Sequence, residues 1–193
     1  CWFLAADFDK DSWAEDAGAL LETCRAKGVP AALERSRSGN GGHVWIFFGE
    51  PVSARTARQL GSALITETME KRPEIGFASY DRLFPNQDTM PKGGFGNLIA
   101  LPLQKWPREN GCSVFVDANL RPYPDQWQFL GSLQPMAAKD VEPTIVRATG
   151  GVHPLDVSFI EEEDQATPWK RVPASTLRLA GSMPKAVTMT LAN

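Results

Sequence analysis

Two acids end the first apolar run of the chain, and their type and spacing could support chemistry. Asp7 and Asp9 follow the apolar segment 1–6 and are separated by one phenylalanine. In an extended strand alternate side chains share a face, so both carboxylates would point the same way. Two like charges held that close repel each other unless a cation lies between them, and Mg²⁺ and Mn²⁺ prefer such oxygen ligands. The pair predicts a metal site, and acids that only end a strand are the alternative interpretation.

A glycine-rich segment lies directly before His43. Residues 38–42 read Ser-Gly-Asn-Gly-Gly, and the flanking residues 31–37 and 43–48 are typical of strands, so together they predict a hairpin. Free backbone N–H groups in its turn, a serine hydroxyl and the imidazole would suit phosphate oxygens. A plain turn with an incidental histidine is the alternative, and the acid pair gives the phosphate interpretation its weight.

Further acids follow later in the chain. Asp81 ends the strand-like run 74–81, Asp88 lies in the turn-rich stretch 81–97, and Asp117 ends a short apolar run. A long proline- and glycine-rich loop inside a domain is often functional, so we expect residues 81–97 to line an active site.

These features have the composition of a two-metal phosphoryl-transfer site. Separated carboxylates would hold two cations, of which one activates an attacking hydroxyl and the other neutralises a leaving pyrophosphate. The hairpin donors would hold a triphosphate, so the protein would supply position and charge without a covalent intermediate.

Two helices are expected to support these strands. Ser12 and Glu15 have the spacing of a capping box, and apolar residues then recur at helical spacing until Gly28. Ser53 has the position of an N-cap for a second helix, which ends near Arg72. Both helices would pack an apolar stripe on the sheet.

The second half of the chain is less regular. Residues 98–104 read as a buried strand, and residues 124–130 as a short helix with proline at its first position. Beyond about residue 134 we predict only strand-like fragments, at 144–147 and 157–160. The domain prediction is a catalytic core at 1–133 followed by an extension or linker, at 134–193, that packs on the core.

Composition restricts the class of protein. The chain has 193 residues, of which 42% are hydrophobic, and no apolar run approaches membrane-spanning length. Three widely separated cysteines offer no disulfide framework, so the cytoplasm is the expected compartment. A net charge of −3 argues against a protein that coats nucleic acid, although cations gather mid-chain and acids at 161–164. The strand-like start without Met predicts a fragment of a longer protein.

Three stretches together resemble the archaeo-eukaryotic primase superfamily, in particular the primase-polymerase modules of bacterial TOTE conflict systems and CRISPR-associated relatives. They are Asp-Phe-Asp at 7–9, Ser-Arg-Ser-Gly-Asn-Gly-Gly-His at 36–43, and Ser-Tyr-Asp-Arg-Leu-Phe-Pro-Asn-Gln-Asp with Gly-Phe-Gly-Asn-Leu-Ile-Ala-Leu-Pro-Leu-Gln between 79 and 104. The resemblance covers residues 1–133. It implies an α+β core in which a mixed sheet, similar to an RNA-recognition fold, packs with helices and a second small α/β unit.

The resemblance also implies an activity and its site residues. The activity is template-directed synthesis or extension of DNA or RNA strands from nucleoside triphosphates with Mg²⁺ or Mn²⁺. Asp7 and Asp9 would bind metal, and His43 would contact the triphosphate with Ser38 and Arg35. Asp81 fits best as the third catalytic and metal-binding acid, Asp88 is the next candidate metal ligand, and Asp117 is the last.

The chain departs from the family pattern at two positions. Gly41 stands where relatives have the serine of a Ser-x-His motif, and Ala100 stands where many have an arginine. We expect Lys92, Asn97 or Gln104 to take over part of the lost nucleotide contact.

Other interpretations remain open from sequence alone. A haloacid-dehalogenase-type phosphatase also has Asp-x-Asp after an apolar strand, but it requires Thr or Val where this chain has Asp11. A glycosyltransferase uses Asp-x-Asp with a metal, yet nothing indicates a sugar-nucleotide fold. A nucleic-acid-binding module without turnover is disfavoured, because two retained carboxylates would repel phosphates. By resemblance, the longer protein would also contain a helicase and a nuclease.

Overall fold

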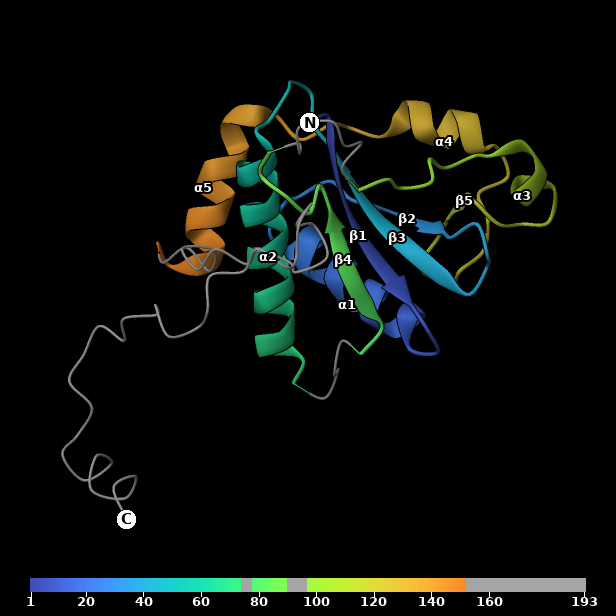
Figure 1. Cartoon of the computed structure of the whole chain (residues 1–193), viewed down its shortest axis with the longest axis horizontal. Coiled ribbons are helices and arrows are strands. Elements are labelled where there is room, and N and C mark those ends of the chain that lie inside the picture. Colours follow the sequence, from blue (N-terminus) through green and yellow to red (C-terminus); the bar gives the residue numbers. More distant parts are fainter. Residues whose placement is uncertain (74–77, 90–96, 152–193) are drawn as a thin grey trace, which may run out of the picture. The chain divides into compact units, whose positions relative to one another are not determined.

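The structure, a computed structural model, describes residues 1–73, 78–89 and 97–151. All of them lie in the first of two units, Cys1–Val157 and Ser158–Asn193. The predicted nucleotide contact Lys92, the fragment 157–160 and the acidic run 161–164 lie outside the described residues. The elements, in chain order (Figure 1), are β1 (Phe3–Asp9), α1 (Trp13–Ala26), β2 (Ala32–Arg35), β3 (Gly41–Phe47), α2 (Ala54–Lys71), β4 (Tyr80–Phe84), α3 (Lys105–Glu109), β5 (Val114–Val116), α4 (Gln126–Ser132) and α5 (Ala138–Thr149).

The described strands form one five-stranded sheet in the order β4-β1-β3-β2-β5. Every neighbouring pair is antiparallel, and parallel pairing among the described residues is limited to a bridge between Phe48 and Met136. The α+β class is therefore confirmed, but the sheet formed by these residues is antiparallel and not mixed. They form this single sheet, so the predicted second α/β unit is not among them. None of the helices in the described ranges is both long and apolar enough to cross a membrane.

The two faces of the sheet differ because side chains alternate along each strand. On β1, Leu4, Ala6 and Phe8 belong to the core formed with α1 and α2. Asp7 and Asp9 alternate with these residues and therefore point to the opposite face. The alternation predicted from Asp-x-Asp is thus confirmed by the burial pattern of β1.

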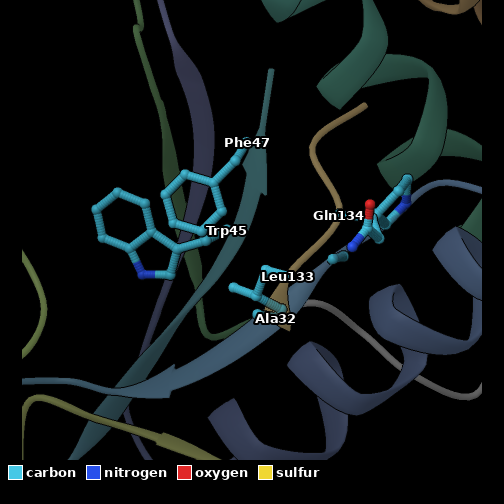
Figure 2. A pocket seen from close by; sticks show the side chains of 7 residues that line it. Ala32, Trp45, Phe47, Leu133 and Gln134 are labelled. Carbon is cyan, nitrogen blue, oxygen red and sulfur yellow. The ribbon is translucent and has the colours of Figure 1, made fainter. Parts of the chain in front are cut away.

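Aromatic packing closes one end of that opposite face. The rings of Trp45 and Phe47 stack with centroids 5.9 Å apart, and Leu133 packs against the same cluster. The pocket beside them is only about 10 Å³ in volume, which is about the space for one water (Figure 2). The other end of this face carries Asp7 and Asp9.

The two expected helices are confirmed as α1 and α2, but α1 starts differently from the prediction. Ser53 Oγ accepts a hydrogen bond from the backbone N–H of Thr56 at 3.0 Å, as an N-cap does. Ser12 makes no such cap bond, because its hydroxyl donates to Asp16 at 3.1 Å. Asp16 also accepts from the Ser79 hydroxyl at 2.6 Å. The predicted capping box is therefore wrong.

Two predicted elements in the region between β4 and α5 also differ. Residues 98–104 form no strand, and Leu98 and Leu101 are 78% and 61% exposed. Asp125, not Pro124, begins the short helix, because its carboxylate accepts hydrogen bonds from two backbone N–H groups of α4.

Helix α5 occupies residues for which the sequence predicts only a strand-like fragment at 144–147. Pro143 lies inside this helix. Because proline is disfavoured within helices, the sequence around it does not predict one, and the prediction for these residues was wrong. Val141 and Ile145 are fully buried and pack α5 against α2. The residues beyond the predicted boundary at 133 thus contribute to the same hydrophobic core.

Candidate active site

Three carboxylates converge at the open end of the sheet. Asp7 and Asp9 come from β1 and Asp81 from the adjacent β4, and one oxygen of each lies within 4.8 Å of the others. Partial burial raises the pKa of the Asp9 carboxyl, and the charges of Asp7 and Asp81 raise it further. Repulsion of this kind indicates a cluster that a cation would stabilise.

A β-bulge turns Asp81 toward the pair. The ladder pairs on either side of the bulge are Ala6 with Leu83 and Phe8 with Tyr80. Two β4 residues, Asp81 and Arg82, therefore oppose the single residue Asp7, and a bulge redirects side chains in this way. Arg82 Nε donates to Asp81 Oδ2 at 2.8 Å. Asp81 is thus the second residue of a strand, although the sequence predicts it at a strand's end.

The two other candidate acids lie elsewhere and have local partners. Asp88 accepts a hydrogen bond from Arg58 Nη1 at 2.6 Å. Asp117 Oδ1 accepts from the backbone N–H groups of Asn119 and Arg121 at 2.8 and 2.9 Å and so shapes a turn. Neither belongs to the three-acid cluster found among the described residues. Of the acids considered from sequence, the structure brings only Asp81 to the pair.

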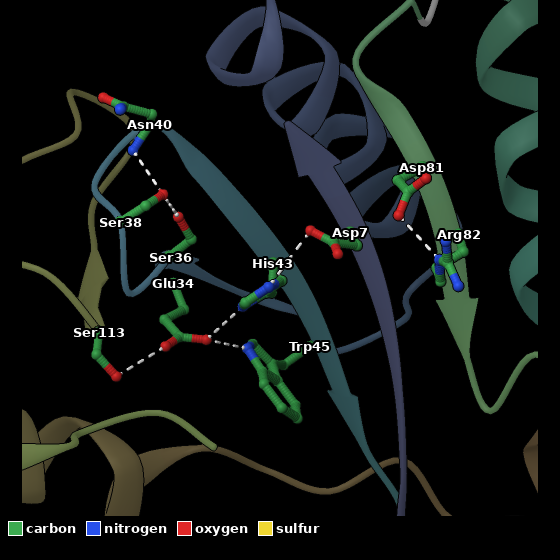
Figure 3. Close-up of polar contacts among 10 residues, drawn as sticks. All are labelled: Asp7, Glu34, Ser36, Ser38, Asn40, His43, Trp45, Asp81, Arg82 and Ser113. Atoms are coloured by element: carbon green, nitrogen blue, oxygen red, sulfur yellow. Dashed lines mark hydrogen bonds and ion pairs between the residues drawn. The ribbon is translucent and has the colours of Figure 1, made fainter. Parts of the chain in front are cut away.

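His43 lies beside this cluster and bridges two carboxylates. It pairs with Asp7 across the β1–β3 ladder, and its Nε2 lies 3.3 Å from Asp7 Oδ1. Its Nδ1 lies 2.9 Å from Glu34 Oε2, at hydrogen-bond distance. Burial opposes the protonated ring, but the hydrogen bonds to Asp7 and Glu34 outweigh it and raise the pKa of His43 to about 9. The imidazole of His43 thus lies between Glu34 and Asp7, at the edge of the acid cluster (Figure 3).

Two consecutive glycines in β3 leave space that groups on the two faces of the sheet occupy. A β-carbon on Gly41 would lie 2.6 Å from Asp9 Oδ1, and one on Gly42 would lie 2.6 Å from the Trp13 ring. Neither position leaves room for a side chain. The family pattern has a serine at the position of Gly41. In this chain the Asp9 carboxylate occupies the space that a serine side chain would need there.

The hairpin tip binds part of its own backbone. Gly39 N donates to Ser36 O at 3.0 Å, and Asn40 N donates to Ser38 Oγ at 3.2 Å. These two amides are therefore not free for a phosphate, contrary to the sequence prediction. The hydroxyls of Ser36 and Ser38 lie 3.0 Å apart, and Ser38 is exposed.

The family model described as the archaeo-eukaryotic primase domain of TOTE conflict systems matches residues 1–144. The chain belongs to this primase family. The resemblance seen in the motifs is confirmed, and membership indicates primase-like nucleotidyl transfer at the family level, with nucleotide and nucleic-acid substrates. None of the curated proteins compared with the chain matches it.

The other predicted contacts of this primase domain have varied surroundings. Arg35 Nη2 donates to Leu120 O at 2.9 Å and so holds the segment between β5 and α4. Gln104 N donates to Ser113 Oγ at 3.3 Å, where α3 begins. Asn97 Nδ2 is buried and has no hydrogen-bond partner among the residues that the structure describes.

Glu34 is a component of the site that sequence reasoning misses. It follows the buried apolar residues Ala32 and Leu33 in β2, is 1% exposed, and pairs directly with His43 across the β2–β3 ladder. Trp45 Nε1 donates to its Oε2 at 2.7 Å, and Ser113 Oγ donates to its Oε1 at 3.2 Å. The available signal was an acid within the predicted strand 31–37, which forms a hairpin with the strand that begins at His43.

Proposed function

We propose that this primase domain extends nucleic-acid strands by template-directed nucleotidyl transfer from nucleoside triphosphates. The supporting observation is the convergence of three carboxylates and the buried imidazole of His43 on one face of the sheet. Family membership supports the reaction class. It also displaces the phosphatase and glycosyltransferase interpretations, so a module that binds nucleic acid without turnover is the remaining rival.

Asp7, Asp9 and Asp81 are the residues that would hold divalent cations. Their oxygens gather within 4.8 Å, and burial together with the charges of Asp7 and Asp81 raises the pKa of the Asp9 carboxyl. Hard oxygen donors in this arrangement fit Mg²⁺ or Mn²⁺. Such cations, when bound, would activate the attacking hydroxyl and neutralise the leaving pyrophosphate.

His43 and the hairpin hydroxyls would bind the triphosphate. The imidazole sits directly against Asp7, so a phosphate bound at the acids would come within reach of its Nε2. Ser36 and Ser38 offer two hydroxyls at the adjoining hairpin. These contacts would orient the nucleotide and compensate its charge.

The nucleic-acid strand would bind at the exposed tryptophans of α3 and α4. Trp106 and Trp127 are 73% and 63% exposed. Lys105 Nζ lies 5.4 Å from the centroid of the Trp106 ring, and Arg108 Cζ lies 5.8 Å from that of Trp127. Aromatic faces beside cations suit stacked bases and their phosphates.

This surface adjoins the hairpin. Ser113, which follows α3 closely in the chain, donates from its backbone N–H to Ser36 O at 3.3 Å. A strand lying across α3 and α4 would therefore lead toward the hydroxyls assigned to the triphosphate.

Nucleotide incorporation on a primed template tests the proposal. The wild-type domain should extend the primer with Mg²⁺ or Mn²⁺, and Asp7→Ala with Asp9→Ala should abolish extension while template binding persists. Glu70→Ala with Glu142→Ala is a matched control, because it removes two exposed acids from helices outside the site. Template binding without extension by the wild-type domain would favour the binding-module rival.

A further inference from the structure

Glu34 is a buried carboxylate whose hydrogen-bond partners indicate its role. It is 1% exposed, and a buried charge is tolerated only when hydrogen bonds compensate the lost water. Its two oxygens receive three hydrogen bonds, from Trp45, His43 and Ser113. All three donors bind the Glu34 side chain, and of the three only His43 also contacts the acid cluster, through Asp7 (Figure 3).

The hydrogen-bond chemistry fixes the orientation of the imidazole. The ionised carboxylate of Glu34 can only accept, so the His43 Nδ1 that faces the oxygen shared with Trp45 carries a proton and donates to it. The Trp45 ring also contacts the imidazole edge-on, with centroids 6.0 Å apart and planes at 86°. The ring is therefore held with Nε2 directed at Asp7.

We propose that Glu34 is a positioning residue for nucleotide binding, which acts by holding His43 in this orientation. The inference rests on the proposed function for the role of His43 toward the triphosphate. Ser113 and Trp45 in turn hold Glu34. Ala32, on the same strand and face, has no polar side-chain group and is buried in an apolar cluster, so burial at this face of β2 does not by itself require a carboxylate.

Two conservative variants separate position from charge. In Glu34→Gln, the amide oxygen still accepts from His43 and Trp45, and the amide nitrogen can donate to the Ser113 hydroxyl. In Glu34→Asp, the charge remains, but the shorter side chain withdraws its oxygens from the imidazole. If Glu34 acts by positioning His43, the apparent KM for nucleoside triphosphate should rise about tenfold or more in Glu34→Asp and stay within about threefold of the wild type in Glu34→Gln. The changes in kcat should be smaller.

A spectroscopic readout does not depend on catalysis. The chain contains two histidines, His43 and His153, so ¹⁵N-histidine spectra are simple to assign. The Nδ1–H signal of His43 should be retained in Glu34→Gln, and should shift and exchange faster with water in Glu34→Asp. His153 serves as the internal reference.

Glu67→Gln is the matched control for loss of a buried charge. This carboxylate is also buried, but it pairs with Lys27 and Lys71 away from the site. It should lower thermal stability without altering the KM or the His43 signals.

Defined results would overturn the inference. Unchanged His43 signals and KM in Glu34→Asp would do so. Impairment of Glu34→Gln with Glu34→Asp spared would also overturn it, because that result would assign the effect to charge. Failure of the proposed function is separate: a wild-type domain without nucleotide incorporation refutes that function, while the imidazole spectra still decide whether Glu34 positions His43.

Discussion

Gly41 lies opposite Asp9 in the β1–β3 ladder, so closely that a β-carbon on the glycine would come within 2.6 Å of the Asp9 carboxylate. The same β-carbon would lie 2.5 Å from the backbone oxygen of Phe8, which cannot move independently of β1. The shape of the acid cluster therefore depends on the absence of a side chain at position 41.

Gly41→Ala should displace Asp9 and weaken cation binding. Overpacking of this kind costs about 1–3 kcal/mol of unfolding free energy. Because Asp9 is one of the three proposed ligands, we expect Mn²⁺ affinity, measured by calorimetry, to fall about tenfold or more.

Gly18→Ala is the control for that substitution. Gly18 lies in α1, and a β-carbon there would meet nothing within 4 Å. Alanine should stabilise this helix by about 0.5–1 kcal/mol and leave Mn²⁺ affinity unchanged. A Gly41→Ala protein with wild-type Mn²⁺ affinity would show that the glycine does not shape the cluster.

Asp81→Asn should lower Mn²⁺ affinity, because it removes the charge that the β4 bulge brings to the pair. The expected loss is about tenfold or more. Asp88→Asn and Asp117→Asn are matched changes at acids with local partners and should leave Mn²⁺ affinity near that of the wild type. A larger effect at Asp88 or Asp117 than at Asp81 would assign the third ligand differently.

Local pattern was sufficient for the parts of the site that depend on local geometry. The shared face of Asp7 and Asp9 follows from the alternation of side chains in a strand, and the hairpin before His43 follows from its glycines. The helices after Ser12 and Ser53 follow from helical periodicity and their flanking residues.

The remaining parts depend on long-range pairing. Asp81 reaches the cluster through a bulge that exists only when β4 pairs with β1. Glu34 gains its role from the register that places it opposite His43. Gly41 is required by a carboxylate more than thirty positions away along the chain. None of these relationships is encoded in the spacing of neighbouring residues.

His43 should make stability depend on pH. Its folded-state pKa of about 9 exceeds its ordinary value of 6.5, so the protonated ring stabilises the fold. By linkage this contribution is complete below about pH 6.5, is lost as the pH rises toward 9, and is worth about 3 kcal/mol. In metal-free buffer, the wild type should therefore exceed His43→Gln in unfolding free energy more at pH 6 than at pH 9. Urea unfolding measures both free energies. If the difference between wild type and His43→Gln were the same at pH 6 and pH 9, the assigned titration of His43 would be contradicted.

The exposed tryptophans give a test of the nucleic-acid surface. Each base stacked on an aromatic ring contributes about 1–3 kcal/mol, so Trp106→Ala and Trp127→Ala should each weaken binding of a single-stranded oligonucleotide about fivefold or more. Trp2→Ala is the matched control, because Trp2 is 60% exposed but lies just before β1, outside α3 and α4. Fluorescence anisotropy at several salt concentrations measures the affinities. Equal losses of affinity in Trp2→Ala and Trp127→Ala would indicate nonspecific contact and remove the assignment of the strand to this surface.

Lys105→Ala should reduce the salt dependence of binding as well as the affinity, because it removes a proposed phosphate partner.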